Sequence, residues 1–557
     1  MATHLAFPSI KSILDLGAQP FQDNKEASHS IMQRYSEALA ETCSEGRSEA
    51  LERHISRGQL LARDRVALLL DPDSPFLELC AFAGYRLDDS TPCASIVAGI
   101  GVIHNRPCMV LSHVPTQSGG AWNEYTVIKQ NRITEIATEN NLPIVALVQS
   151  AGVFLPQQFR VFHKGGQIFR DLAVRTQQGK PTCAVVFGSS TAGGAYHPAL
   201  SDYTIFVEDQ AQVFLGGPPL VKMATGEEAT AEELGGAKVH ATVTGLADQI
   251  AVDEFDAVQK AREWVASLDP SVPSQISFKT PLEPRYPAED LMAIVNPDIR
   301  KPFDMMEVLI RIVDDSRLLN FKPAFGRNLI TAWANILGAK ELFHELTYFV
   351  NAFTGHRVGI VANGTPIINP DEASKGAQFI RMCNQQNTPI VFFHNVTGFM
   401  VGSKAEHAAI IKRGAQMVSA VSCSTVPHIS IILGASYGAG NYAMCGRAYR
   451  PRFLFTWPIG RCSVMGPDQL SGVMENIQRA SAKSQGREIV EEEIQASTKS
   501  FRDDVLRDSE CYKTSAVGLD DGIIDPRDTR DVLGMCLEVV HIPGVNGTET
   551  HQILARM

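Results

Sequence analysis

Short apolar runs bounded by turn residues recur along this chain and predict buried strands. Residues 143–149 read PIVALVQ and residues 389–396 read PIVFFHNV; each run precedes a stretch with helical spacing and then a second apolar run, CAVVF or ISIIL. A strand covered on both faces is apolar at successive positions, and parallel strands need a helical crossover. The pattern therefore predicts two sets of βαβ units, with helices over 159–179 and 406–422.

The two sets follow one plan. Phe187–Tyr196 reads FGSSTAGGAY and Leu433–Tyr442 reads LGASYGAGNY, with glycine second, serine fourth and tyrosine last in both. These segments and the PIV runs are related by one constant offset of 246 residues. The repeat predicts an α/β protein with two tandem domains, each with a largely parallel sheet.

A proline-rich segment separates the copies. Residues 268–290 read LDPSVPSQISFKTPLEPRYPAED and lack periodicity, which predicts a linker. Charged amphipathic helix is predicted over 30–70 and 472–509, either as packing arms or as solvated surface helices. The predicted organisation is an N-terminal arm (1–50), a first domain (51–270), a linker (271–290), a second domain (291–535) and a tail (536–557).

Composition narrows the classes of function. The 557 residues are 44% hydrophobic and carry a net charge of −11, which gives nucleic acid and acidic membranes no attractive overall field. No apolar run reaches the roughly 18 residues that a membrane helix needs. The eleven cysteines lack metal-ligand spacing, so we expect reduced core residues and no metal site. Nucleic acid and membranes are therefore not expected as partners.

The N-terminal residues carry neither the apolar region of a secretory signal nor an arginine-rich presequence. We therefore expect the cytoplasm or the mitochondrial matrix. The last three residues, Ala555-Arg556-Met557, loosely resemble a peroxisomal tripeptide, which is the alternative address.

The glycine turns are the candidate chemistry. A strand that ends in small residues and opens a helix presents backbone N–H groups, and Gly193 and Gly194 have no side chain to hold a ligand away. Such donors can stabilise the oxyanion that forms when a thioester loses its α-proton. For a single glycine pair, tight packing between helix and strand is the more common explanation. The repetition of the pair in LGASYGAGNY favours two oxyanion holes, one for each of two carbonyl-bearing reactants.

Side-chain catalysts are scarce by comparison. The sequence has no nucleophile elbow, phosphate-binding loop or zinc motif. His163, His394 and His407 are isolated, and lone histidines are commonly structural. An enzyme with oxyanion holes and no obvious base suggests that a substrate or cofactor supplies the base.

Longer segments resemble one protein family. They are ISRGQLLARDR (55–65), SPFLELCAFAGY (74–85), FLGGPPLVKMATGEEATAEELGGAKVH (214–240), VTGFMVG (396–402), SYGAGNYAMCGRAYRPRFLFTWP (436–458), SVMG (463–466) and DDGIIDPRDTR (520–530). From about residue 50 onward the chain resembles the β subunits of biotin-dependent acyl-CoA carboxylases, most of all those for methylcrotonoyl-CoA.

The resemblance implies two tandem crotonase-like (ClpP/crotonase superfold) carboxyltransferase domains, the first for acyl-CoA and the second for carboxybiotin. In this family carboxybiotin releases CO2, its ureido nitrogen accepts the acyl-CoA proton, and the enolate captures CO2, which would account for the missing base. The implied residues are Gly193, Gly194, Ala439 and Gly440 as oxyanion donors, Ser150, Ala151, Gly152, Ala192 and Tyr196 at the acyl-CoA, and Thr397, Gly398, Phe399, Met400 and Val401 at the biotin. Phe154 and Trp122, with Tyr196, are expected to shape the acyl pocket.

The resemblance also implies partners. The sequence shows no biotin-attachment lysine and no ATP-binding carboxylase segment, and Val221-Lys222-Met223 lies in a stretch that is not biotinylated in the family. A separate biotin-carrying α subunit is therefore expected, together with a homo-oligomer whose sites lie at the protomer interface. The cofactors are then biotin on that subunit and coenzyme A as part of the substrate.

Four positions depart from the family pattern. Gln149–Val153 replaces Asp-Ser-Gly-Gly-Ala, Ser118 replaces a lysine, Pro467-Asp468 replaces Gly-Glu, and residues 339–354 form an extra segment. Because the departures cluster near the implied site, three functions stay open. They are an acyl-CoA carboxyltransferase, a divergent biotin-independent CoA-thioester decarboxylase or hydrolase, and a non-catalytic assembly paralogue.

Overall fold

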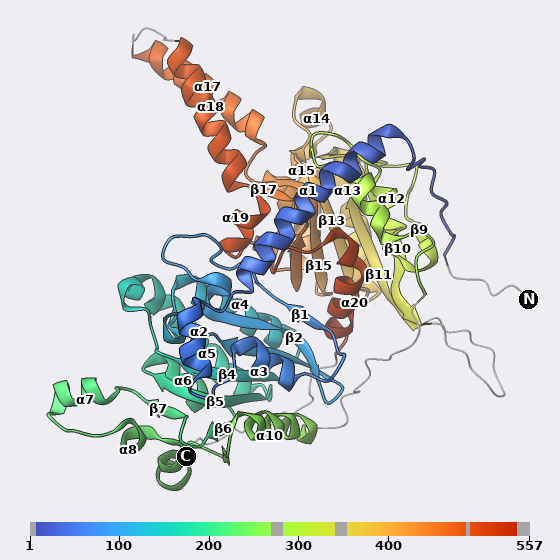
Figure 1. Ribbon diagram of the computed structural model, residues 1–557. Helices are drawn as coiled ribbons and strands as arrows, with labels where there is room; N and C mark the ends of the chain where they lie inside the picture. Colours follow the sequence, from blue (N-terminus) through green and yellow to red (C-terminus); the bar gives the residue numbers. More distant parts are fainter. Residues whose placement is uncertain (1–6, 269–281, 340–353, 486–490, 543–557) are drawn as a thin grey trace, which may run out of the picture. The chain divides into compact units, whose positions relative to one another are not determined.

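The computed structural model describes residues 7–268, 282–339, 354–485 and 491–542 (Figure 1). The described residues form two compact units. The N-terminal unit comprises 37–268, 516–518 and 538–542; the C-terminal unit comprises 7–36, the described residues from 282 to 515, and 519–537.

The N-terminal unit is built on one sheet with the order β1-β2-β3-β4-β5-β6-β8, and β7 pairs with β5. The first three strands pair antiparallel, whereas β3 to β8 are parallel to their neighbours. The strands are β1 (Phe76–Glu78), β2 (Ile96–Ile103), β3 (Arg106–His113), β4 (Ile144–Ser150), β5 (Thr182–Thr191), β6 (Tyr203–Val207), β7 (Gln212–Phe214) and β8 (Gln249–Ala251). The predicted parallel pair of PIVALVQ and CAVVF, now β4 and β5, is confirmed.

Helices of this unit connect and cover the strands. They are α2 (Ser48–Ile55), α3 (Ala62–Leu69), α4 (Glu124–Glu139), α5 (Gln158–Gln177), α6 (Gly193–Ala199), α7 (Pro218–Thr225), α8 (Ala231–Gly235), α9 (Ala237–Val239) and α10 (Glu254–Ser267). The predicted crossover helix is confirmed as α5. The single helix expected over 30–70 is wrong: Gly46 and Gly58 have φ values of 125° and 76°, and they interrupt it between α1 (Gln19–Thr42), α2 and α3.

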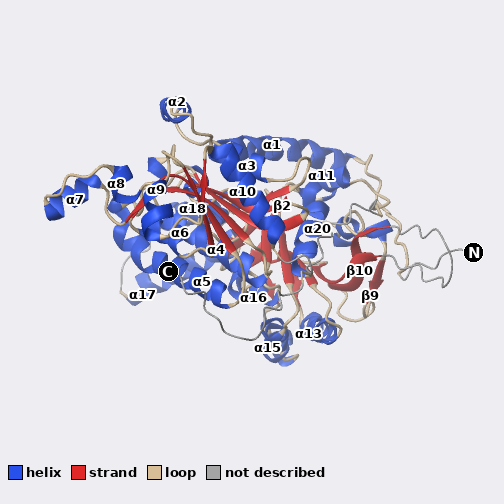
Figure 2. Ribbon diagram, turned by 90° about the horizontal axis from the view of Figure 1, so that it is seen from below, coloured by secondary structure: helices blue, strands red, loops and turns tan. Residues whose placement is uncertain are grey.

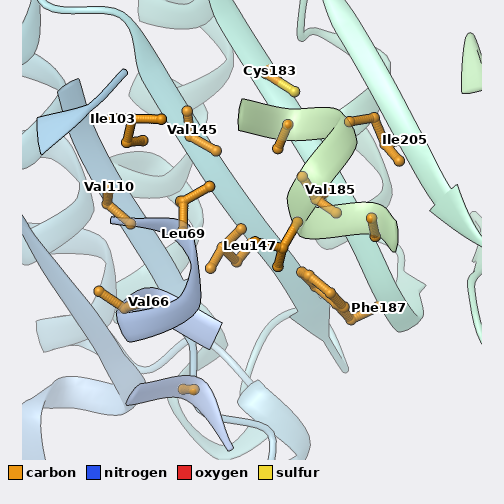
Figure 3. Packing of buried hydrophobic residues seen from close by; sticks show 14 of the residues in the cluster. Val66, Leu69, Ile103, Val110, Val145, Leu147, Cys183, Val185, Phe187 and Ile205 are labelled. Atoms are coloured by element: carbon orange, nitrogen blue, oxygen red, sulfur yellow. The ribbon is translucent and has the colours of Figure 1, made fainter. Parts of the chain in front are cut away.

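A core cluster packs α3 against the parallel strands (Figure 3). Val66 and Leu69 of α3 belong to one cluster with Val145 of β4 and Val185 of β5, and all four side chains are buried. Full burial of such a side chain stabilises the fold by about 1.5–3 kcal/mol. The continuous apolar runs that predicted these strands are thus explained by covering on both faces.

The C-terminal unit has a second sheet with the order β16-β15-β13-β11-β10-β9, and β17 pairs with β15. Its strands are β9 (Leu318–Asn320), β10 (Leu329–Ala339), β11 (Thr354–Asn363), β13 (Ile390–Val396), β15 (His428–Tyr437), β16 (Phe453–Thr456) and β17 (Arg461–Ser463), and β12 (Ile367–Ile368) pairs separately with β14 (Gly398–Phe399). PIVFFHNV and ISIIL form the parallel pair β13 and β15, as predicted. The antiparallel strands β10 and β11 flank the extra segment, whose residues 340–353 lie outside the described part of the chain.

The helices of this unit, with α20 at its end, are α11 (Leu291–Ile294), α12 (Met305–Leu309), α13 (Pro370–Gln385), α14 (Ser403–His407), α15 (Ile410–Cys423), α16 (Gly438–Ala443), α17 (Pro467–Ser484), α18 (Glu491–Asp508), α19 (Cys511–Ala516) and α20 (Thr529–Val540). Figure 2 shows α13 and α15 side by side. One continuous helix over 406–422 is a wrong prediction, because Ala409 adopts φ 62° and separates α14 from α15.

The first amphipathic stretch divides between the two units: residues 30–36 belong to the C-terminal unit and the remainder to the N-terminal unit. Within the C-terminal unit the Tyr35 hydroxyl of α1 donates to the Ile523 carbonyl at 3.1 Å. The stretch 472–509 forms α17 and α18, which lie against each other (Figure 1). Of the two roles predicted for each stretch, the first part of α1 takes that of a packing arm.

The two copies of the repeat also share buried contacts and register shifts that the sequence motifs do not reveal. Lys129 of α4 and Lys375 of α13, which are 246 residues apart, are both buried and donate to the carbonyls of Ile96 and Leu329 at 2.6 and 2.8 Å. The register also shifts at the same place in both copies, between Val148 and Ser150 and between His394 and Val396. The strands that lead into the two glycine turns are therefore arranged in the same way in the two sheets.

Candidate active site

The first glycine turn joins β5 to α6 in the N-terminal unit. Ala192 adopts φ 51° and ψ −118°, a conformation that costs a residue with a Cβ atom on the order of 1–3 kcal/mol. Gly193 and Gly194 then open the helix, where the first N–H groups have no intrahelical acceptor. In the described part of the chain neither N–H has a hydrogen-bond partner. The turn therefore presents two consecutive donors.

The end of β4 packs directly against this turn. A Cβ atom on Gly194 would lie 3.1 Å from Cβ of Ser150, and one on Gly152, which has φ 83°, would lie 2.9 Å from the Thr191 carbonyl oxygen. The Ser150 hydroxyl donates to the Gly120 carbonyl at 2.8 Å and accepts from the Gly152 N–H at 3.1 Å. The structure thus brings Ser150, Gly152 and the glycine turn together.

Aromatic side chains form a wall beside Gly193. A Cβ atom there would lie 3.6 Å from both Cζ of Phe169 and Cζ3 of Trp122. The Phe169 ring centroid is 5.4 Å from that of Tyr196 and 6.3 Å from that of Trp122. Sequence reasoning named Trp122 and Tyr196 but missed Phe169, because its place on α5 gives no local signal.

His113 fixes the orientation of the Trp122 ring. Nε1 of Trp122 donates to Nε2 of His113 at 3.1 Å, and both side chains are buried. Burial lowers the pKa of His113 to about 4, so its ring is neutral near pH 7 and can accept this bond. The other residues expected at this end are placed nearby: Ala151 and Tyr196 are exposed, and the Phe154 N–H donates to the Trp122 carbonyl at 2.9 Å.

Gln149, which replaces a family aspartate, does not face the turn. Its Oε1 accepts from Nη1 of Arg65 at 3.0 Å, while Arg65 also forms a buried bidentate pair with Glu254 at 2.8 Å. Its amide lies over Gly188, where a Cβ atom would come within 2.4 Å of Nε2. Because Arg65 is already neutralised by Glu254, the neutral amide leaves no unbalanced charge.

The other two departures are local. Ser118 is exposed and begins a turn with φ 50°. Pro467 opens α17, a position where the missing N–H of proline costs no helical hydrogen bond. Asp468 pairs with Arg502 at 2.6 Å.

The second glycine turn joins β15 to α16 in the C-terminal unit. Gly438 has φ 54°, and a Cβ atom on it would lie 2.9 Å from the Val464 carbonyl oxygen. Gly440 packs against the end of β13, since its Cβ atom would lie 2.6 Å from Cγ2 of Val396 and 3.2 Å from Cα of Gly398. Among the described residues, the N–H groups of Ala439 and Gly440 have no hydrogen-bond partner.

The loop expected to meet biotin lies beside this turn. The Thr397 and Met400 N–H groups donate to the carbonyls of Pro366 and Ile368 at 2.6 and 2.9 Å, and Phe399 pairs with Ile368 in the small sheet. Val401 is 81% exposed. The loop is therefore held by its backbone, and its apolar tip is open to solvent.

The buried histidine beside the second turn is not suited to act as a base. Burial lowers the pKa of His394 to about 3, and its Nδ1 lies 2.9 Å from the Ser436 hydroxyl, so it is a weak base with a structural partner. His163 and His407 are exposed residues of α5 and α14. The described residues contain no group of three or more His, Cys, Asp or Glu side chains that could hold a metal ion. Within the same residues no helix is long and apolar enough to cross a membrane.

Each unit thus assembles one of the two expected sets of residues. Sequence reasoning missed one shared feature: Asn395 covers Gly434 as Gln149 covers Gly188, with a Cβ atom on Gly434 lying 2.8 Å from Oδ1 of Asn395. The two residue pairs are related by the 246-residue offset, so the repeat in the sequence could have identified them. Only the packing shows that each side chain covers a glycine of the neighbouring strand.

Comparisons with known proteins agree on one family. The model of the carboxyl transferase domain matches residues 53–341 and 348–545. The chain is 44% identical over 543 residues to a probable biotin-dependent acyl-coenzyme A carboxylase β2 subunit of Mycobacterium tuberculosis, covering 97% of this chain and 98% of that one. It is 42% identical to the probable mitochondrial methylcrotonoyl-CoA carboxylase β chain of Drosophila melanogaster, covering 95% and 92%.

A solved structure is similar over nearly the whole chain. The β subunit of geranyl-CoA carboxylase from P. aeruginosa matches with a TM-score of 0.86 and 38% identity, covering 96% of this chain and 97% of that one. The prediction of two tandem crotonase-like carboxyltransferase domains is confirmed.

Proposed function

Because the chain belongs to the carboxyltransferase β subunits of biotin-dependent acyl-CoA carboxylases, we propose that it carboxylates a short branched acyl-CoA, 3-methylcrotonoyl-CoA or a close analogue. It is an enzyme subunit of that family, and the identity of the acyl group is the part proposed. The 42% identity to a methylcrotonoyl-CoA carboxylase β chain supports this choice. Because the chain is also similar to a geranyl-CoA carboxylase β subunit, geranyl-CoA is the competing candidate substrate.

The observation that carries the proposal is the duplicated turn with two unpaired backbone donors in each copy. Carboxybiotin, when bound, supplies CO2 and a ureido nitrogen that accepts the α-proton of the thioester. The N–H groups of Gly193 and Gly194 would hold the thioester oxygen as negative charge develops on it. Those of Ala439 and Gly440 would do the same for the ureido oxygen. Removing one such donor typically costs about 10²–10³ in rate.

The aromatic wall supports a short acyl chain. Trp122 is held by His113, and Phe169 lies between Trp122 and Tyr196. We propose that this wall closes the acyl pocket beside Gly193 and limits the length of the chain it accepts. Ser150, Ala151, Gly152 and Ala192, which are all small, would form its other side.

The proposal includes partners and a location. Biotin would be carried by a separate α subunit, and the loop Thr397–Val401, with its exposed apolar tip, would receive it. The chain would act as a homo-oligomer with sites at the protomer interface, in the cytoplasm or the mitochondrial matrix. The mitochondrial relative supports the second location.

Reconstitution tests the proposal. The purified chain is mixed with a biotinylated α subunit, ATP and ¹⁴C-bicarbonate, and label is measured in 3-methylcrotonoyl-CoA and in geranyl-CoA. We expect transfer to the shorter substrate, loss of transfer in Gly194→Val, and retention in Gly472→Ala, whose added Cβ atom meets no atom within 4 Å outside the backbone of its own helix.

Three results would contradict it. No labelled product with any short or branched acyl-CoA excludes the carboxyltransferase reaction. Turnover of a malonyl-type thioester by the isolated chain supports a biotin-independent decarboxylase or hydrolase. Unchanged activity of an assembled complex that carries Gly194→Val supports a non-catalytic paralogue.

A further inference from the structure

A cavity of about 440 Å³ lies in the C-terminal unit, near the second glycine turn. Its lining comes from the segment 297–300, the ends of β15 and β17, the first turn of α17, one side of α18 and the loop residues Pro366 and Thr397. This volume is within the range of small-molecule sites, roughly 300–1,000 Å³. No residue of the lining is among the nine implied at the acyl-CoA or as oxyanion donors; of the expected biotin residues it includes Thr397.

The charges around the cavity leave one cation unpaired. Arg300 binds Asp298 through two bonds of 2.9 Å, and Arg502 pairs with Asp468 at 2.6 Å. Arg461 has no carboxylate partner among the described residues; its Nη1 donates to the Leu506 carbonyl at 2.6 Å. Its Nε and Nη2 remain, so the lining carries one net positive charge and free guanidinium donors.

Tyr437 adds a buried donor without an acceptor. Its side chain lines the cavity and is only 2% exposed, yet its hydroxyl has no hydrogen-bond partner within the described residues. Burial raises the pKa of Tyr437 to about 12, so the phenol keeps its proton at physiological pH. Buried polar groups in folded proteins are nearly always paired, so this hydroxyl is available to an acceptor bound in the cavity.

We propose that this cavity binds a single carboxylate group, with the guanidinium of Arg461 and the phenol of Tyr437 donating to its two oxygens. A monoanion matches the one unpaired charge. A phosphate dianion would leave excess negative charge beside Asp298 and Asp468, which also line the cavity. Guanidinium and phenol donors in a sheltered site are suited to a carboxylate, because hydrogen bonds to charged groups are the stronger class.

The carboxylate could come from two sources. One is the N-carboxylate of carboxybiotin, held before transfer, and this source rests on the proposed function. The other is a free organic acid that regulates the subunit. Both offer the same chemistry to Arg461 and Tyr437, so binding to the cavity and the source of the ligand are tested separately.

Binding is tested on the full-length chain with sodium butyrate as the probe, followed by ligand-observed NMR. We expect saturable butyrate binding in the millimolar range and none of butyramide, the neutral isostere. Tyr437→Phe and Arg461→Gln are expected to weaken butyrate binding by about 10- to 100-fold. Lys412→Gln, an exposed charge change on α15 outside the cavity, is expected to leave it unchanged.

Tyr437→Phe is the decisive variant, because it keeps the ring and removes only an unpaired hydroxyl, so the protein should fold as before. Equal butyrate affinity in wild type and Tyr437→Phe, or equal binding of butyramide, would overturn the proposal. So would the absence of saturable binding. None of these readouts depends on CO2 transfer, so a chain that binds butyrate but carboxylates nothing would fail only the proposed function.

The reconstituted complex then identifies the source. If the site holds the N-carboxylate, butyrate inhibits competitively against the biotinylated α subunit, and Tyr437→Phe raises the KM for that subunit. If it holds a free acid, butyrate changes kcat without competing. Either pattern upholds a carboxylate site, whereas inhibition that is unaffected by Tyr437→Phe contradicts it.

Discussion

The two glycine turns occupy the same place in two copies of one fold, yet they differ at two of three positions. The first reads Ala192-Gly193-Gly194 and the second Gly438-Ala439-Gly440. Both first residues have φ near +50°, at 51° and 54°. Both third residues are buried against the end of the neighbouring strand, at Ser150 or at Val396.

The difference separates what the turn requires from what it tolerates. Only the third position is glycine in both copies, and there a Cβ atom would contact the adjacent strand at 3.1 or 2.6 Å. The first position tolerates alanine at the cost of strain, and the second tolerates it freely. Close approach at the third position, rather than flexibility of the whole turn, is therefore the constraint that the two copies share.

The largest expected effect is at the third position. In Gly440→Ala the new Cβ atom would lie 2.6 Å from Val396 and 3.2 Å from the Gly398 backbone, so the turn must move and its donors with it. We expect kcat of CO2 transfer to fall by about 10²–10³. Gly194→Ala, with contacts from 3.1 Å, should fall by less. Steady-state kinetics of the reconstituted complex measure both, with Gly472→Ala as the control; wild-type kcat in Gly440→Ala would refute the shared constraint.

The first position should respond unequally in the two turns. Gly438→Ala places a Cβ atom 2.9 Å from the Val464 carbonyl at positive φ, and we expect it to lower the unfolding free energy by about 1–3 kcal/mol. Ala192→Gly removes strain that is already present and should change stability by about 1 kcal/mol or less. Urea unfolding followed by fluorescence measures both. Equal destabilisation by the two changes would show that the strain at Ala192 is absent.

Both units also contain buried neutral histidines, which makes their stability fall with acid. Burial lowers the pKa of His197 on α6 to about 3 and that of His428 on β15 to about 4. Between a pKa of about 6.5 in the unfolded chain and these values, the unfolded state binds more protons, so stability is lost as pH falls through that window.

The measurement is thermal stability from pH 7 to pH 4 for the wild type and His197→Asn, whose side-chain oxygen can accept the bond that Gln130 Nε2 makes at 3.0 Å. We expect a shallower slope in the variant. Because carboxylates titrate at the lower end, the comparison is made between pH 6.5 and 5. Identical slopes in that range would mean that His197 is not held neutral.

The smallest effect is expected at the second position. In Gly193→Ala the new Cβ atom would meet Phe169 and Trp122 at 3.6 Å, an ordinary contact, and Ala439→Gly removes an exposed methyl group. Exchanging these residues between the turns should change kcat by no more than about two- to threefold. A larger loss in kcat for Gly193→Ala would mean that the wall beside the first turn has no room even for a methyl group.

Much of the architecture could be predicted because it depends on local patterns of apolar and turn residues along the chain. The apolar runs at 143–149 and 389–396 fixed the strand type, and the 246-residue offset revealed the duplication. The break in the helix predicted over 406–422 was harder to predict. It occurs at Ala409, which adopts a left-handed conformation that is unusual for alanine. The glycines at 46 and 58 did carry a breaking signal, which the amphipathic pattern of 30–70 obscured.

The sequence by itself determined the repeat, the family and the residues of both glycine turns, since periodicity, spacing and motif are properties of neighbours along the chain. Only the tertiary structure decided what those residues touch. Phe169 beside Gly193, Gln149 over Gly188 and Tyr437 on the cavity wall all depend on contacts between distant elements. Such contacts follow from how helices pack on a sheet, which no single stretch of the chain encodes.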